Sequence, residues 1–204
     1  MLAVGAGVNG NVPNLLLIIA STRPGRAGLP VAEWALDGIR QHGVFDVDRA
    51  DLLEINLPLL DEPNHPALRR YTKDHTFAWS ARVDAADAVV IVTPEYNYGM
   101  PGSLKNALDF LSQEWNYKPV GFVSYGGISG GTRSVQMAKQ VVTTLKMMPM
   151  FEAVNIQWIK NHLVDGRFET TEILDRSLQA MLTELARWAA ALAPMRRTKN
   201  DLTS

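Results

Sequence analysis

One stretch of the chain combines residue types that could bind a flat molecule. Thr93 to Phe110 reads TPEYNYGMPGSLKNALDF and follows the apolar run Ala88–Val92. Tyrosines bring aromatic surface, carboxylate and amide groups bring fixed hydrogen bonds, and glycines let the backbone approach a ligand closely. The alternative is a plain helix entry with packed tyrosines and a solvated glutamate. The residues that we predict to contact the ligand are Pro94, Glu95, Tyr96, Asn97, Tyr98 and Gly99.

A second polar loop, Ser21-Thr22-Arg23-Pro24-Gly25-Arg26-Ala27-Gly28, lies between an apolar run and a helical pattern. Hydroxyl and guanidinium groups at a helix N-terminus favour an anion such as phosphate. The pattern G-x-x-x-x-G-K-[ST] is absent, so nucleoside triphosphate chemistry lacks its main support. A capped turn with solvated arginines is the alternative. We assign the phosphate to Ser21, Arg23, Arg26 and Gly28.

A third loop, Ser124 to Gly131, reads SYGGISGG. Its paired glycines could form a mobile turn, or could aim backbone N–H groups at an electron-rich ring edge. The residues assigned to that edge are Ser124, Tyr125, Gly126 and Gly127.

The sequence gives less support to cysteine chemistry, to a dinucleotide-binding fingerprint and to metal binding. The chain has no cysteine, which excludes disulfides, thiolate nucleophiles and iron–sulfur ligation. The pattern G-x-G-x-x-G at Gly5–Gly10 precedes the first strand, so we interpret it as part of a tail. The histidines lack paired metal-ligand spacing, and we expect surface or packing roles and no metal for His42, His65, His75 and His162. Any redox chemistry must therefore come from a cofactor, in which case no catalytic side chain is required.

The charge balance limits the partners. Lys+Arg is 20 against Asp+Glu 21, a formal net charge of −1, so we expect neither nucleic acid nor an anionic membrane as a partner. The N-terminus lacks a basic segment followed by a long apolar one, and no later apolar run could span a bilayer. We predict an unexported, cytoplasmic protein.

Strand and helix patterns alternate along the chain. Apolar strand patterns cover 14–20, 44–53, 87–93, 120–124 and 150–158, and helical patterns cover 29–41, 68–84, 101–112, 132–147 and 172–193. This alternation predicts an α/β fold, a three-layer doubly wound five-stranded parallel sheet. We place one domain at 14–194, between flexible tails at 1–13 and 195–204. Ligands of such sheets bind outside the carboxyl ends of the strands, where the three loops fall.

Four large side chains receive structural roles from their patterns. Trp34 and Met137 are predicted to be core positions on helices. Trp115 and Tyr117 could line an acceptor pocket or pack a subunit interface, and we favour the interface.

The segment Thr93–Asp109 resembles the central motif of the NADPH-dependent FMN reductases, which are flavodoxin-like flavin and quinone reductases. Ser21-Thr22-Arg23, Tyr125-Gly126-Gly127 and Gly130-Gly131-Thr132-Arg133 match the flanking loops, and the resemblance covers 15–150. It implies bound FMN, with its phosphate in the first loop, its isoalloxazine against 94–98 and its pyrimidine edge near 124–127. It also implies a homodimer, or a homotetramer built of dimers, with the flavin close to the neighbouring subunit.

The first loop departs from the family pattern. Many members carry Gly-Ser at its start and Ser and Asn later, whereas this chain has Ala20-Ser21, Arg26 and Gly28. Arg26 could bind the FMN phosphate, reach the 2′-phosphate of NADPH, or be exposed.

The function that we expect is an FMN-dependent oxidoreductase that transfers hydride from NADPH or NADH to quinones, free flavin or similar acceptors by a ping-pong mechanism. Backbone donors at Gly126 and Gly127 would stabilise the negative charge of the reduced flavin. A flavodoxin-type electron carrier is the competing hypothesis, although a near-neutral chain does not suit an electrostatically docking acidic carrier. A ligand-binding regulatory module is a third.

Overall fold

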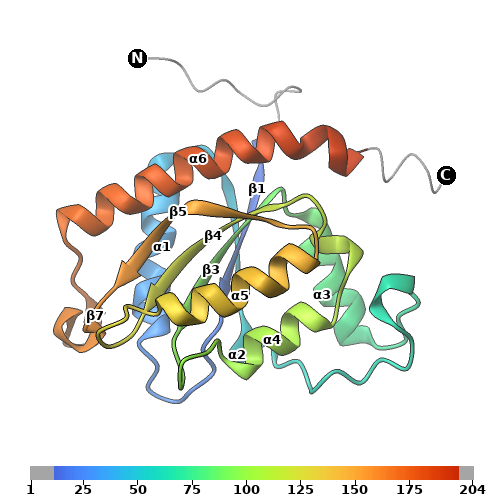
Figure 1. Ribbon diagram of the computed structural model, residues 1–204, viewed down its shortest axis with the longest axis horizontal. Coiled ribbons are helices and arrows are strands. Elements are labelled where there is room, and N and C mark those ends of the chain that lie inside the picture. Colours follow the sequence, from blue (N-terminus) through green and yellow to red (C-terminus); the bar gives the residue numbers. More distant parts are fainter. Residues whose placement is uncertain (1–11, 198–204) are drawn as a thin grey trace.

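A five-stranded parallel sheet forms the centre of the protein (Figure 1). The computed structural model describes residues 12–197. The strands are β1 (Asn14–Ile19), β2 (Asp46–Asp51), β3 (Ala88–Pro94), β4 (Pro119–Tyr125) and β5 (Met148–Ile156), in the order β2-β1-β3-β4-β5. The predicted doubly wound α/β sheet is confirmed. Its strand order reverses between β1 and β3, which places the switch point there.

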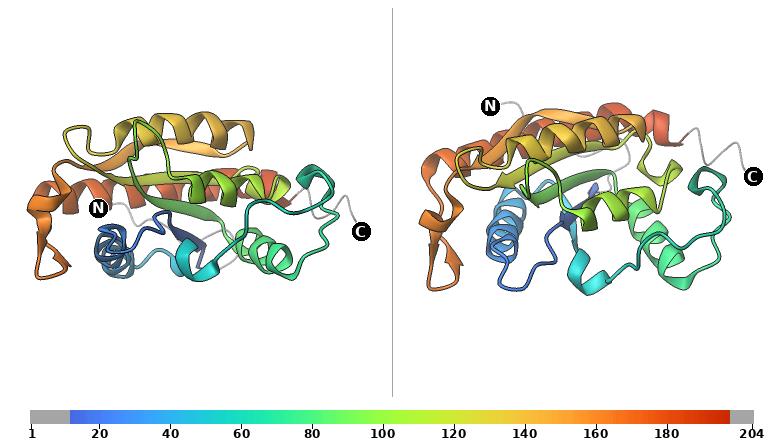
Figure 2. Two further views of the ribbon diagram at one scale, coloured as in Figure 1. Left: turned by 90° about the horizontal axis from the view of Figure 1, so that it is seen from below. Right: turned by 60° about the horizontal axis from the view of Figure 1, so that its bottom comes forward.

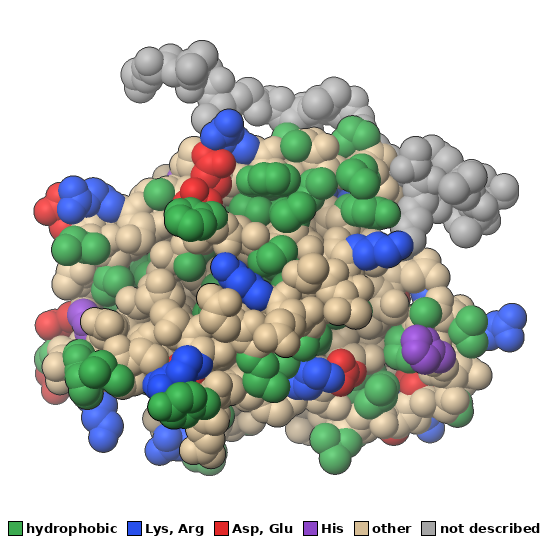
Figure 3. Space-filling view, viewed as in Figure 1, with side chains coloured by type: hydrophobic (Ala, Val, Ile, Leu, Met, Phe, Trp, Pro, Cys, Tyr) green, Lys and Arg blue, Asp and Glu red, His purple; other side chains and the backbone are tan. Residues whose placement is uncertain are grey.

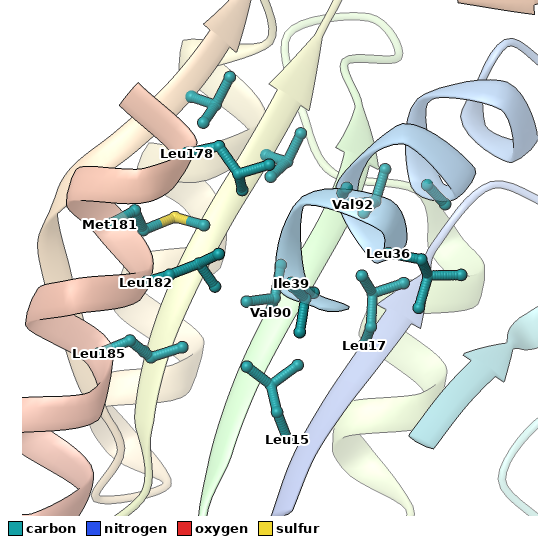
Figure 4. Packing of buried hydrophobic residues seen from close by; sticks show 14 of the residues in the cluster. Leu15, Leu17, Leu36, Ile39, Val90, Val92, Leu178, Met181, Leu182 and Leu185 are labelled. Atoms are coloured by element: carbon teal, nitrogen blue, oxygen red, sulfur yellow. The ribbon is translucent and has the colours of Figure 1, made fainter. Parts of the chain in front are cut away.

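Helices cover both faces of the sheet. On one face lie α1 (Gly28–His42) and α6 (Glu172–Arg197), and on the other lie α3 (Asp74–Ala85), α4 (Gly102–Asp109) and α5 (Thr132–Thr144). Every residue of β3 and β4 is buried, as expected of central strands covered on both sides. Figure 4 shows how Leu178, Met181 and Leu182 of α6 and Ile39 of α1 pack over the same face of the sheet.

Short elements complete the fold. They are the helix α2 (Leu52–Ile55), the 3₁₀ helices η1 (Pro66–Leu68), η2 (Gln113–Trp115) and η3 (Ile159–His162), and the antiparallel pair β6 (Leu163–Val164) and β7 (Arg167–Phe168). In both views of Figure 2 the orange β6–β7 hairpin projects from the body beside α1. Phe168 of this hairpin packs against Trp34 of α1, with ring centroids 5.1 Å apart.

Several element boundaries differ from those predicted. The helix expected over 68–84 begins only at Asp74, because the Glu62 carboxylate accepts hydrogen bonds from the backbone N–H groups of Thr72 and Lys73 and holds the preceding loop in another shape. The last helix continues to Arg197, so the tail predicted from 195 begins too early. Residues 1–11 and 198–204, which include the Gly5–Gly10 pattern, lie outside the described residues.

Two predicted side-chain roles were wrong. Trp115 is fully buried, and its indole N–H donates to the Leu108 carbonyl oxygen, so it can line neither an acceptor pocket nor a subunit interface. Met137 is 43% exposed rather than a core residue, and its sulfur lies next to Gly99 in the loop after β3, 3.0 Å from where a Cβ on Gly99 would be.

Residues 12–197 contain neither a membrane-spanning helix nor a metal-binding cluster. No helix there combines the length and the apolar character needed to cross a membrane. In the same range, no group of histidine and acidic side chains has the arrangement of a metal site.

Candidate functional site

Side-chain hydrogen bonds bring the three predicted loops together at the carboxyl ends of β1, β3 and β4. The Ser21 hydroxyl lies 2.7 Å from the Tyr96 hydroxyl and joins the first loop to the second. The Ser129 hydroxyl donates to the Glu95 carboxylate at 2.8 Å and joins the third loop to the second. These loops are 75 and 34 residues apart in the chain, and the parallel sheet makes them neighbours.

The loop after β1 offers a series of free backbone donors. Within the described chain, no backbone N–H of residues 21–27 donates to a protein acceptor. The loop leads into α1, whose N-cap residue Ala27 provides no side-chain cap and whose first turn has no acidic residue. Arg23 is exposed and forms no ion pair with any residue of 12–197. Unpaired donors, an uncapped helix N-terminus and a free guanidinium together suit a phosphate.

Tyr125 lies beneath this loop and not at its surface. Its side chain is 4% exposed, and its buried hydroxyl makes no hydrogen bond of normal geometry within residues 12–197, although the Ser21 hydroxyl lies near enough to lower its pKa slightly. A Cβ atom on Gly28 would lie 2.5 Å from that hydroxyl, so Gly28 makes room for Tyr125. Burial and the neighbouring Tyr96 raise the pKa of Tyr125, which keeps the hydroxyl protonated and able to donate. An orphaned buried donor next to unpaired amides fits a site that holds a phosphate group.

Arg26 has a protein partner. Its Nη1 and Nη2 donate to Asp51 Oδ1 and Oδ2 at 2.6 and 2.5 Å, and Nη1 also donates to the Ser21 carbonyl oxygen at 2.6 Å. The side chains of Arg26 and Asp51 are 9% and 0% exposed. Because this guanidinium is compensated and buried, we retain neither of the phosphate roles considered for Arg26, nor the exposed alternative.

The loop after β3 is a tight hairpin. Tyr96 and Gly99 exchange two backbone hydrogen bonds of 3.0 Å across Asn97 and Tyr98, whose φ angles are 48° and 70°. Two left-handed residues in succession are typical of a type I′ turn, and a tyrosine adopts this conformation at an energetic cost. The turn holds the Tyr98 ring outward, 73% exposed, and Arg133 stacks on it with its guanidinium carbon 3.7 Å from the ring centroid. Strain of this kind is common at ligand sites.

Glu95 anchors this hairpin instead of facing solvent. Its side chain is 6% exposed and forms an ion pair with Arg133 Nε at 2.6 Å. It also accepts a hydrogen bond from the Arg133 backbone N–H at 3.2 Å. The carboxylate therefore fixes the second loop to the N-terminus of α5. Arg133 was not among the predicted ligand-contacting residues, although its place at a helix start after a glycine-rich loop could have indicated it.

The third loop uses two of its predicted ligand groups internally. Ser124 Oγ is buried, 2.7 Å from the Gly130 carbonyl oxygen, and the Gly126 N–H donates to the Ile156 carbonyl oxygen at 3.1 Å. Neither is free to bind a ring edge as predicted. The N–H of Gly127, in contrast, has no acceptor within residues 12–197, and Gly127 is exposed. Of the expected backbone donors, one remains available.

A profile of the NADPH-dependent FMN reductase family matches residues 13–159, which include all three loops. The chain belongs to this family. The predicted resemblance is confirmed, and family membership makes the chain an enzyme whose cofactors are FMN and NAD(P)H.

Individual relatives agree with this assignment. The chain is 42% identical over 137 residues to an NAD(P)H-dependent FMN reductase of Schizosaccharomyces pombe, covering 66% of this chain and 68% of that protein. It is 38% identical over 111 residues to a quinone reductase of Escherichia coli K12, covering 52% and 58%. Among solved structures, the NAD(P)H:acceptor oxidoreductase FerB of Paracoccus denitrificans matches this chain with a TM-score of 0.69 at 20% sequence identity. The match covers 87% of this chain and 97% of FerB, and it supports the fold alone.

The residues of the three loops fit FMN, the cofactor of the family. Free amides at 21–27, the orphaned Tyr125 hydroxyl and Arg23 could hold the phosphate of FMN, and the exposed hairpin could hold its ring. Contacts of Pro94, Tyr96, Asn97, Tyr98 and Gly99 with the flavin stay predictions.

Proposed function

We propose that this FMN reductase carries hydride equivalents from NAD(P)H to quinones or free flavin by a ping-pong mechanism. The observation that carries the proposal is the pairing, at the switch point, of an amide-rich loop able to bind phosphate with an exposed aromatic hairpin. Such a pairing fits a molecule with an anionic end and a flat end. FMN, when bound, supplies the hydride and electron chemistry.

The chain's own residues orient and expose that molecule. The amides of 21–27 and Arg23 bind the anion, and the Tyr96 hydroxyl, paired to Ser21, fixes the hairpin relative to the phosphate loop. Asn97 and Tyr98 leave the outer side of the hairpin open to solvent. A single open face serves NAD(P)H and the acceptor in turn, and this sharing is the physical basis of a ping-pong cycle.

Initial rates test the proposal. NADPH oxidation is measured on the FMN-loaded protein at several fixed concentrations of menadione, and the account predicts parallel double-reciprocal lines. Intersecting lines would show that both substrates bind together and would contradict the shared face. Heat-stripped protein supplies the control, because it should lose the rate and regain it with added FMN.

The electron-carrier hypothesis predicts another result. A carrier would hold FMN and accept electrons from a partner reductase, yet would show no turnover with NAD(P)H and a quinone. Turnover at a rate that free FMN does not reach excludes the carrier.

We also propose that the chain assembles as a homodimer or homotetramer. Hydrophobic side chains gather along α6 on the face drawn in Figure 3. Of the α6 residues, Ile173, Trp188 and Met195 are 67%, 38% and 47% exposed. Near the site, Ile128 and Trp158 are also exposed. Contiguous exposed apolar surface marks interaction sites. Light scattering after size-exclusion chromatography measures the mass, and a monomer at micromolar concentration would contradict this part of the proposal.

A further inference from the structure

The geometry points to Asp51 as a positioning residue that acts through Arg26 to hold the 21–27 loop in the shape that receives the flavin phosphate. This inference rests on the proposed function. Asp51 ends β2, the strand next to β1 at the edge of the sheet, and lies outside all three loops predicted from the sequence.

The hydrogen bonds around Asp51 connect three elements. Oδ1 accepts from Arg26 Nη1 at 2.6 Å and from the Leu53 N–H at 3.0 Å, which caps α2. Oδ2 accepts from Arg26 Nη2 at 2.5 Å and from Arg49 Nη2 at 3.1 Å. Both oxygens are thus fully used, and the carboxylate has no capacity left for a ligand.

Arg26 closes the loop on itself. Its side chain starts near the end of the loop, and Nη1 reaches back to the Ser21 carbonyl oxygen at the beginning, 2.6 Å away. This contact occupies the Ser21 carbonyl oxygen, so that the oxygen is not left free beside an anion. The N–H groups of the same loop are left without protein acceptors among the described residues. The pair therefore presents donors and hides an acceptor, as an anion site requires.

Stability alone does not account for this ion pair. Burying two charges costs desolvation energy that their attraction often fails to recover, and well-packed apolar residues can replace such a pair without loss. A bidentate, planar contact does, however, fix the orientation of the Arg26 guanidinium relative to the Asp51 carboxylate. The role of the Arg26–Asp51 pair is therefore to fix the shape of the 21–27 loop.

Replacing Asp51 by asparagine separates positioning from direct binding, because only the positioning role predicts weaker FMN binding. The asparagine side chain keeps the volume and one oxygen for the α2 cap but loses the second acceptor and the charge. If Arg26 only positions the loop, Asp51→Asn loosens it. A loop that adopts the competent shape for about a tenth of the time weakens FMN binding about tenfold. If Arg26 binds the phosphate itself, Asp51→Asn frees its charge and FMN binds equally well or more tightly.

Riboflavin provides the second measurement, because it has the ring of FMN without the phosphate. Quenching of flavin fluorescence gives both dissociation constants for the full-length protein. The account predicts that Asp51→Asn and Arg26→Ala each weaken FMN but leave riboflavin within about twofold, and that the double variant is no worse than either single one, since coupled residues are not additive. Equal weakening of both flavins would indicate general damage and overturn the inference.

A matched control lies on the same strand. Asp48 of β2 forms an ion pair with Arg82, Oδ1 to Nη2 at 2.6 Å, but faces away from the loop, and Asp48→Asn should leave both flavins bound as in the wild type. If Asp51→Asn does not fold, Arg26→Lys keeps the charge and loses the bidentate contact, and it should weaken FMN selectively. Wild-type protein that binds no FMN contradicts the proposed function, whereas FMN binding that is indifferent to Asp51 and Arg26 contradicts only this inference.

Discussion

At the scale of single residues, the two arginines of the first loop differ in what surrounds them. Arg26 is buried against Asp51, whereas Arg23 is exposed without an ion pair in the described chain. Arg23→Ala should therefore remove one charge-assisted contact to phosphate, about 1.5–3 kcal/mol, and weaken FMN roughly ten- to a hundredfold. Isothermal titration with FMN measures this loss. Arg40→Ala, in the last turn of the helix α1 that follows this loop, is the control and should change nothing. Unchanged FMN affinity in Arg23→Ala would contradict a contact between Arg23 and the phosphate.

Tyr125 offers a second test at this scale. Its hydroxyl makes no hydrogen bond of normal geometry among the described residues, so Tyr125→Phe should leave the stability of the flavin-free protein unchanged or slightly higher. A hydroxyl that donates to the phosphate or to its bridging water contributes about 0.5–1.5 kcal/mol, so FMN should bind several-fold more weakly. Titration with FMN and with riboflavin measures both. An equal loss of affinity for riboflavin would indicate that the hydroxyl contacts the flavin ring, as predicted from the sequence.

At the scale of elements, the glycine-rich loop that starts α5 depends on one position more than on its neighbours. Gly131 has a φ of 84°, and a Cβ there would lie 2.8 Å from Ser124 Cβ and from the Tyr125 backbone nitrogen. Gly131→Ala combines a left-handed penalty of about 1–2 kcal/mol with overpacking of about 1–3 kcal/mol, and should lower the free energy of unfolding by about 2–5 kcal/mol. Gly127→Ala is the matched control, since open space surrounds it and the expected change is within about 0.5 kcal/mol. Urea denaturation measures both, and equal stabilities would refute the packing argument.

Elements with strong periodicity were predictable, and those that depend on distant contacts were not. The buried runs of β1, β3 and β4 and the alternation with helices indicated the sheet and its covered faces. The short helix α2 was missed because its start relies on the Asp51 cap inside a segment that reads as a strand. The β6–β7 hairpin was missed because two-residue strands leave no periodic pattern.

The site was predictable to the level of loops. The rule that ligands bind beyond the carboxyl ends of parallel strands located all three. It could not assign partners within them, because the Arg26–Asp51 and Ser21–Tyr96 pairs join residues 25 and 75 positions apart and depend on strand order and side-chain rotamers. For the same reason the Glu95 carboxylate was not expected to be buried against Arg133.

At the scale of the whole molecule, stability depends on pH through a buried lysine just before the amino end of β4, at the opposite end of the strands from the candidate site. Lys118 is 3% exposed and donates to the Val83 and Asp84 carbonyl oxygens at the end of α3, and burial lowers its pKa to about 8. The unfolded chain holds this proton up to a pKa near 10.4, so the unfolded state binds more protons between these values. The free energy of unfolding should therefore rise from about pH 8 to about pH 10 in wild type relative to Lys118→Met, by roughly 2–3 kcal/mol. If the free energies of unfolding of the two proteins varied with pH in parallel, the lowered pKa of Lys118 would be contradicted.

The central claim is that one chain binds one FMN at the switch point between β1 and β3. The most direct measurement is the visible spectrum of the purified or FMN-reconstituted protein, followed by chromatographic identification of the flavin released by heat. The account predicts a yellow protein that releases FMN at about one molecule per chain. Release of FAD, or no bound flavin after reconstitution, would contradict it.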